Sequence, residues 1–284
     1  MAITAQAVKE LRDRTGAGMM DCKKALTETD GNLEEAVKFL RTKGLAAAAK
    51  KAHRSASDGA VVITGDENSM MVLELNCETD FVARNPDFQA FAEALASQAL
   101  SSGAASVEEL KAQPFANDAE HTVEEAVSQM IATIGENIVL SRLSGIAAGS
   151  GNRLSSYVHG GGKIGVVVEG TGAASDDALH DVALHVAATD PRFVTREDVT
   201  DELLATEREI ALKQAVDSGK PEEIAKRIVE GKMEKFFEQE VLLEQAFAKD
   251  PSKSVTEYLK EAAGDDATVV RFVRFKLGEG SDES

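Results

Sequence analysis

Apolar residues recur at three- and four-residue spacing near the start of the chain, a pattern that predicts three short helices. The first is expected to begin at the cap Thr4 and to end before Gly16, and the second follows directly. The third opens with Asn32 and ends at Gly44, after which an Ala-, Lys- and Ser-rich stretch forms a helical or flexible tether. Residues 1–54 are therefore predicted to be a three-helix module with its tether.

The pattern then changes to β-strands joined by turn residues. Residues 60–63 and 70–77 predict a hairpin around a Gly-Asp-Glu-Asn turn. A helix follows from Asn85 and Pro86, and residues 137–146 predict a closing strand. These elements indicate a first core subdomain, residues 55–147.

The same order recurs later in the chain. Residues 154–159 and 164–169 predict a second hairpin, residues 176–188 a helix, and residues 268–277 a closing strand. This second subdomain covers residues 148–284. The expected fold class is α+β, with two related subdomains that each consist of an antiparallel sheet with helices on one face.

One insertion breaks this symmetry, at about residues 200–237. It predicts two long helices joined at Ser218–Pro221, which a short turn makes antiparallel. Such a helical hairpin either packs against the body or serves as a docking arm, and the sequence leaves both open.

A short connector after the first hairpin holds an acid beside a large ring, Asp80-Phe81. Connectors lie on the surface, where a ring loses its burial energy of roughly 2–3 kcal/mol unless it folds into the core or enters a partner. Phe81 is thus either a core residue or a probe of a partner.

Charge and composition argue against some classes of protein. The formal net charge is −18, although residues 1–55 alone carry a small positive excess. An acidic body argues against nucleic acid as the main ligand. The N-terminus resembles no targeting leader and no apolar run reaches membrane-spanning length, so we expect a cytoplasmic protein.

Candidate catalytic chemistry is weak. Gly162-Lys163 lacks the hydroxyl residue and first glycine of a phosphate-binding loop, so no nucleotide is expected to bind directly. His180 and His185 point about 140° apart on a helix and cannot share a metal. Neither a metal nor a cofactor is expected, and Cys22 and Cys77 read as reduced structural thiols.

Several motifs together resemble the bacterial elongation factor Ts family, over essentially the whole chain. None is specific alone, but their order is. They are Leu11–Leu26, Asn76–Ala83, Ile134–Ile138, Tyr157–Gly160 and Ser218–Ala225.

The resemblance implies a non-enzymatic guanine nucleotide exchange factor, whose partner is the GTPase elongation factor Tu. It implies a module similar to ubiquitin-associated domains, a two-subdomain core and a coiled-coil hairpin. It also implies that Thr79–Val82 enters the GTPase near its bound magnesium, which needs regular octahedral oxygen geometry. The further contact residues that it implies are Arg12, Met19, Met20, Ile134, Gly135 and His159.

The sequence leaves other interpretations of these residues and of the protein's class open. Packing of the three helices would bury at least one of Met19 and Met20 instead of exposing both. A second class is a non-catalytic helical adaptor or chaperone-like binding protein, which would not need an exposed Phe81. A third is an enzyme that uses Cys22 or Cys77.

Overall fold

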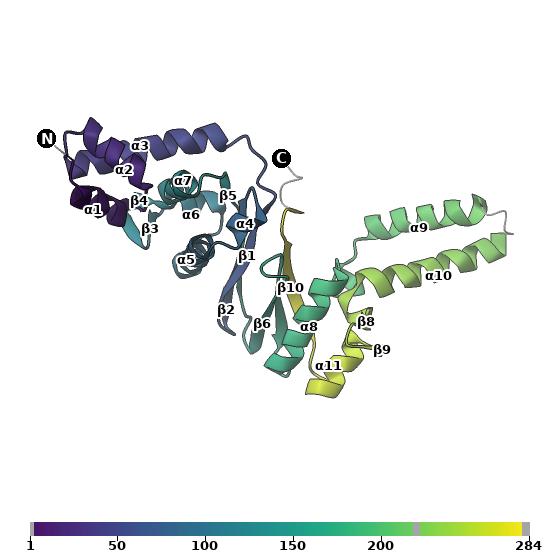
Figure 1. Cartoon of the computed structure of the whole chain (residues 1–284). Helices are drawn as coiled ribbons and strands as arrows, with labels where there is room; N and C mark the ends of the chain where they lie inside the picture. The colour runs from purple at the N-terminus through teal and green to yellow at the C-terminus, as the bar shows by residue number, and fades with distance from the viewer. Residues whose placement is uncertain (1–2, 218–221, 280–284) are drawn as a thin grey trace.

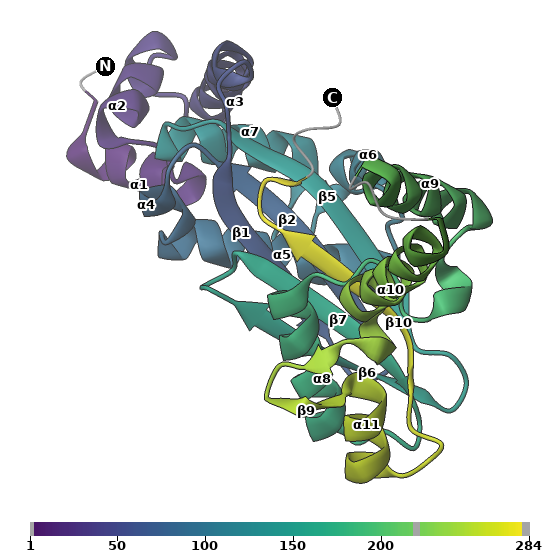
Figure 2. The same cartoon turned by 90° about the vertical axis from the view of Figure 1, so that its right-hand side faces the viewer.

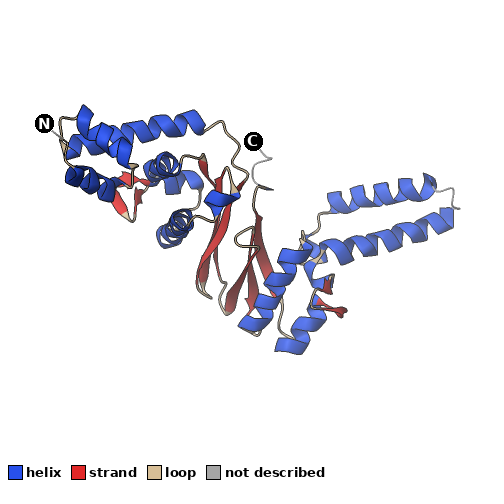
Figure 3. Ribbon diagram, viewed as in Figure 1, coloured by secondary structure: helices blue, strands red, loops and turns tan. Residues whose placement is uncertain are grey.

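The computed structural model describes residues 3–217 and 222–279, with the side chains of residues 222 and 223 excepted. Two three-stranded antiparallel sheets lie face to face at its centre, and helices cover their outer faces (Figures 1 and 3). The N-terminal helices lie beyond one outer layer, and a helical hairpin projects from the other (Figure 1). The predicted α+β class is confirmed.

The N-terminal module contains three helices, α1 (Ala5–Thr15), α2 (Met19–Glu28) and α3 (Leu33–Lys51). The predicted N-caps are confirmed, because the side chains of Thr4 and Asn32 accept hydrogen bonds from the first-turn N–H groups of α1 and α3. The buried residues of this module form a small core of their own: Leu11, Ala17, Cys22, Ala25, Leu26, Ala36 and Leu40.

The predicted end of the third helix at Gly44 is wrong. Helix α3 continues to Lys51, and Gly44 faces Ser128, Gln129 and Ala132 of helix α7 (Val123–Ile134). A glycine at this position lets the two helices approach closely, so it is a packing residue and not a C-terminal stop. The stretch predicted as a tether therefore docks on the core.

Polar contacts reinforce this docking. Gln129 Nε2 donates to the backbone oxygen of Thr15 over 2.9 Å, and Lys51 Nζ donates to that of Ile131 over 3.2 Å. Arg41 pairs with Glu125.

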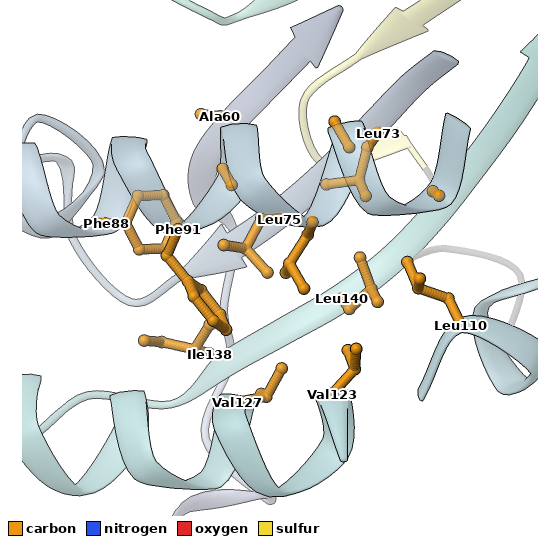
Figure 4. Packing of buried hydrophobic residues seen from close by; sticks show 14 of the residues in the cluster. Ala60, Leu73, Leu75, Phe88, Phe91, Leu110, Val123, Val127, Ile138 and Leu140 are labelled. Atoms are coloured by element: carbon orange, nitrogen blue, oxygen red, sulfur yellow. The ribbon is translucent and has the colours of Figure 1, made fainter. Parts of the chain in front are cut away.

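The first sheet has the order β1-β2-β5, from β1 (Asp58–Gly65), β2 (Ser69–Cys77) and β5 (Ile138–Ala147). Its outer face packs on α5 (Pro86–Ser102), α6 (Val107–Ala112) and α7. Phe88 and Phe91 of α5 lie beside Leu75, and Val123 and Val127 of α7 point into the same core near Ile138 and Leu140 (Figure 4).

The second sheet has the order β10-β7-β6, from β6 (Asn152–His159), β7 (Ile164–Thr171) and β10 (Val269–Lys276). Helices α8 (Asp176–Thr189) and α11 (Val255–Ala263) cover its outer face, which Figure 2 views from the helix side. Both predicted hairpins and closing strands are confirmed.

Each sheet forms a unit with the helices that cover it, and the two units share small features that the sequence did not predict. Each holds a short hairpin before its last helix, β3 (Pro114–Phe115) with β4 (Asp118–Thr122), and β8 (Ala246–Phe247) with β9 (Asp250–Ser254). Each second strand runs into a capping box, Thr122 with Glu125 and Ser254 with Glu257.

A buried polar residue supports each of these short hairpins. In the first unit, Gln98 Oε1 accepts from the N–H of Ala116 over 2.8 Å. In the second, His185 Nδ1 accepts from the N–H of Ala248 over 3.0 Å, and Nε2 donates to Gln245 Oε1. His185 is thereby held as the neutral tautomer. His180, on the exposed side of α8, shares none of these contacts.

Acid pH is expected to destabilise the protein through His185. Burial lowers the pKa of His185 below its ordinary value of 6.5, so below that pH the unfolded chain takes up the proton first and stability falls. His185→Gln, which copies Gln98, should flatten this part of the pH dependence, whereas the matched His180→Gln should not. Denaturant unfolding between pH 7 and pH 5 tests this, and parallel curves for wild type and His185→Gln would contradict it.

Two ion pairs, each between a buried glutamate and a partly exposed arginine, join the two sheets symmetrically. Glu74 of β2 accepts from Arg142 Nε over 2.7 Å, and Glu169 of β7 accepts from Arg271 Nε over 2.6 Å. Arg142 also donates to a backbone oxygen of β10, and Arg271 to one of β5. Because each arginine reaches the edge of the opposite sheet, the pairs fix how the sheets sit on one another. The apolar residues between them are Val61, Met70, Val72, Ile146, Leu154, Val167 and Phe275.

The inserted hairpin contains α9 (Asp201–Asp217) and α10 (Glu222–Glu240), which pack along each other (Figure 1). The predicted turn Ser218–Pro221 lies outside the described residues. Short 3₁₀ turns, Arg196–Asp198 and Leu242–Glu244, connect the hairpin to the second unit. The hairpin projects away from the sheets and their covering helices (Figure 1). The alternative that it simply packs against the body is therefore wrong, and its use as a docking arm stays a prediction.

Candidate partner-binding site

Strand β2 leads directly into a one-turn helix, α4 (Asp80–Ala83), that presents Phe81. Thr79 is its N-cap and accepts weakly from the N–H of Val82 over 3.4 Å. Asp80 pairs with Arg84 over 3.1 Å. The connector predicted here is therefore helical, and we call residues 78–84 the Phe81 turn.

Phe81 is 84% exposed, although it lies only seven residues before the fully buried Phe88. The interpretation of Phe81 as a core residue is therefore wrong. Val82 faces the other way and packs against the apolar core between the first sheet and helices α5 to α7, which we call the first core cluster, while Ala83 is buried. Of the four residues Thr79–Val82, the ring of Phe81 reaches furthest into solvent, with the partly exposed Asp80 beside it. A large exposed ring on a short, anchored turn is typical of a protein-contact site.

The loop between α7 and β5 lies against this turn and anchors it. Glu136 Oε2 accepts from the backbone N–H groups of Glu78 and Thr79 over 3.1 and 3.0 Å. Its Oε1 accepts from the hydroxyl of Thr79 over 2.7 Å. The structure thus brings together two of the predicted groups, Thr79–Val82 and Ile134–Gly135.

A second carboxylate makes the reciprocal contact. Glu78 Oε1 accepts from the backbone N–H of Asn137 over 2.7 Å and from Arg54 over 3.3 Å. The N–H of Asn137, supported by Arg54, holds the pKa of Glu78 below its usual range, so this carboxylate stays charged. Asn137 Nδ2 in turn donates to the backbone oxygen of Arg54. The end of the N-terminal module is therefore tied to the Phe81 turn.

Ile134 and Gly135 form the end of α7. Gly135 is the C-cap, with a left-handed φ of 93° that other residues adopt only with strain, and it is exposed. Ile134 is half-buried against the first core cluster. Both therefore lie one or two residues from Glu136 and beside the Phe81 turn.

His159 lies at the end of β6 and is exposed. Its Nδ1 is 3.0 Å from the hydroxyl of Tyr157. The turn that follows contacts β1, where the N–H of Val61 donates to the backbone oxygen of Gly162. Because β1 starts opposite Cys77, His159 and the Phe81 turn lie at the same end of the two sheets.

The N-terminal module carries Arg12, Met19 and Met20 on α1 and α2, so these residues lie apart from the Phe81 turn. Both methionines are exposed, Met19 to 60% and Met20 to 72%, and Arg12 is exposed as well. The expectation that helix packing would bury at least one methionine is wrong, because α2 instead buries Cys22, Ala25 and Leu26. Exposed methionines are typical of adaptable binding surfaces.

The cysteines do not suit nucleophilic chemistry. Both are buried, and burial raises the pKa of each thiol, that of Cys77 to about 12 with Glu136 as a second cause. The thiolate is the reactive form, so neither residue is activated.

Within residues 3–217 and 222–279, no cluster of three or more His, Cys, Asp or Glu side chains is placed to hold a metal ion. Among the described residues, none of the helices is both long enough and apolar enough to span a bilayer.

Sequence reasoning missed Glu78, Glu136 and Arg54 as supporting residues. Their contacts join positions 24 to 83 residues apart, so no local pattern shows them. The available signal is an acid directly after the glycine cap of α7, between a helix and a strand. Such a residue is well placed to accept hydrogen bonds from a neighbouring turn.

An exposed ring on an anchored turn, together with exposed methionines on the N-terminal helical module, is typical of a protein that makes protein contacts. The family described as elongation factor TS matches residues 78–279. The elongation factor Ts of Clostridium botulinum (strain Alaska E43 / Type E3) is 48% identical over 99% of this chain and 95% of its own length. That of Trichlorobacter lovleyi is 46% identical over 100% of this chain and 95% of its own length.

The chain therefore belongs to the elongation factor Ts family. Members of this family are translation elongation factors, which serve protein biosynthesis.

Proposed function

We propose that this protein is a guanine nucleotide exchange factor, which releases GDP from elongation factor Tu in the cytoplasm. The observation that carries the proposal is the exposed Phe81 on a turn anchored by Thr79 and Glu136. An exposed apolar ring is unfavourable in water and gains free energy on entering a partner. Membership of the elongation factor Ts family supports elongation factor Tu as that partner.

The proposed mechanism uses contacts alone. Magnesium in a GTPase bridges the nucleotide phosphates and requires near-ideal octahedral oxygen geometry. Phe81, with Asp80 beside it, would enter next to this ion and disturb its ligands, so the phosphates would be held less tightly. Ile134, Gly135 and His159 would widen the contact on the same end of the sheets, while Arg12, Met19 and Met20 would bind through the N-terminal module.

Thermodynamic linkage gives a direct test. If the protein weakens GDP binding to elongation factor Tu, GDP must weaken the protein's own binding by the same factor. Calorimetric titration into nucleotide-free and GDP-loaded elongation factor Tu should therefore give clearly different affinities. Equal affinities would show that the protein binds without promoting exchange, as the alternative adaptor or chaperone-like class requires.

The isolated protein is expected to bind neither GDP nor GTP. The motivation is the sequence around Gly162-Lys163, which lacks the residues of a phosphate-binding loop. Calorimetric titration of each nucleotide at high protein concentration would measure this, and tight binding of either would contradict a role that depends on the partner's nucleotide site alone.

A further inference from the structure

We propose that Glu136 is a positioning residue for nucleotide exchange, which holds the Phe81 turn so that the ring projects in one fixed orientation. The inference rests on the proposed function and adds a residue that does not itself have to touch the partner. It follows from three hydrogen bonds that converge on one carboxylate, from Glu78 N–H, Thr79 N–H and the Thr79 hydroxyl.

These bonds act on the part of the turn that sets the direction of Phe81. Helix α4 has four residues, too few to be stable by its own hydrogen bonds, so its neighbours must fix its orientation. Glu136 binds both the backbone and the side chain of its N-cap, Thr79. Hydrogen bonds to a charged carboxylate are roughly twice as strong as neutral ones.

The ring itself offers little restraint. Phe81 is 84% exposed, so its position follows the backbone that carries it. On the inner side, Val82 and Ala83 pack on the core and hold the end of the turn. Glu136 holds the start, and the two ends together define the direction of the ring. Loss of Glu136 would leave the inner packing in place and free the N-cap.

Two substitutions separate geometry from charge. Glu136→Ala removes all three acceptor contacts. Glu136→Gln can keep them, because its oxygen accepts from the two N–H groups and its amide donates to the Thr79 hydroxyl, which can also accept. Glu93→Ala, at an exposed position of α5, is the matched control that removes the same charge away from the turn.

The experiment measures the maximal rate of GDP release from elongation factor Tu at saturating concentration of each variant. Glu136→Ala should lower this rate about ten-fold, as small displacements of a contacting group often do. Glu136→Gln should remain within about two-fold of wild type, and Glu93→Ala should match it. Amide hydrogen exchange at Glu78 and Thr79 should accelerate in Glu136→Ala and not in Glu136→Gln.

A double substitution tests whether Glu136 acts through the ring. In the Phe81→Ala background, Glu136→Ala should cause a much smaller loss than in the wild type, since the ring is gone and only Asp80 remains to be positioned. Additive losses would overturn the inference, as would a Glu136→Gln variant as slow as Glu136→Ala, which would indicate a direct charge contact. Wild-type protein that fails to accelerate release overturns the proposed function as well, whereas acceleration that Glu136→Ala leaves unchanged overturns the positioning role alone.

Discussion

Phe81→Ala is expected to slow the release of GDP from elongation factor Tu by roughly 30-fold, the effect of losing a contact worth ~2 kcal/mol. The variant should unfold within about 0.5 kcal/mol of wild type, because an exposed ring contributes little to the fold. Stopped-flow release of labelled GDP and denaturant unfolding, measured on the same preparation, test both parts.

Phe88→Ala is the matched comparison. Phe88 is fully buried between α5 and the first sheet, so its truncation should cost about 3–5 kcal/mol of stability. Release per folded molecule should stay close to wild type. A Phe81→Ala variant that loses stability in the same way, with normal release, would contradict the assignment of Phe81 as a contact residue.

Removal of residues 1–54 is expected to weaken association with elongation factor Tu by about ten-fold or more, as loss of exposed contact residues commonly does. The truncated core should still fold, because its main cluster comes from the first sheet and α5 to α7. It should be less stable than the full chain, however, since the docked face of α7 and the contact from Arg54 to Glu78 are lost. Calorimetric titration and thermal unfolding measure the two effects.

Substitution of both Met19 and Met20 by serine separates recognition from folding. Both side chains are exposed, so the double variant should keep the stability of the full chain. It should lose much of the affinity that the deletion loses. A truncated core that binds as tightly as the full chain would show that the module serves another purpose.

Much of the fold follows from local sequence signals. Caps at Thr4, Asn32 and Asn85 mark helix starts correctly, because the side chain that satisfies the first N–H groups is next to them in sequence. Gly44 misled the same reasoning, since a glycine that ends a helix and one that allows close helix packing look identical without the partner helix. The short hairpins were missed because their first strands have only two residues each.

The candidate site likewise has a part that local sequence predicts and a part that depends on tertiary contacts. Its exposed end could be proposed from Asp80-Phe81, since an acid beside a ring in a connector already raises the possibility of a contact. Its support could not, because Glu136 and Arg54 reach the turn only after the two halves of the first unit fold together. The direction of Met19 and Met20 also depended on tertiary packing, which selected Cys22 and Leu26 for the core of the module.

The most direct test is the release of labelled GDP from elongation factor Tu upon mixing with this protein, in the presence of excess unlabelled GDP. The account predicts that release accelerates with increasing protein and approaches a maximum, and that Phe81→Ala lowers that maximum. Release that proceeds at its spontaneous rate at every concentration of well-folded wild-type protein would contradict the account.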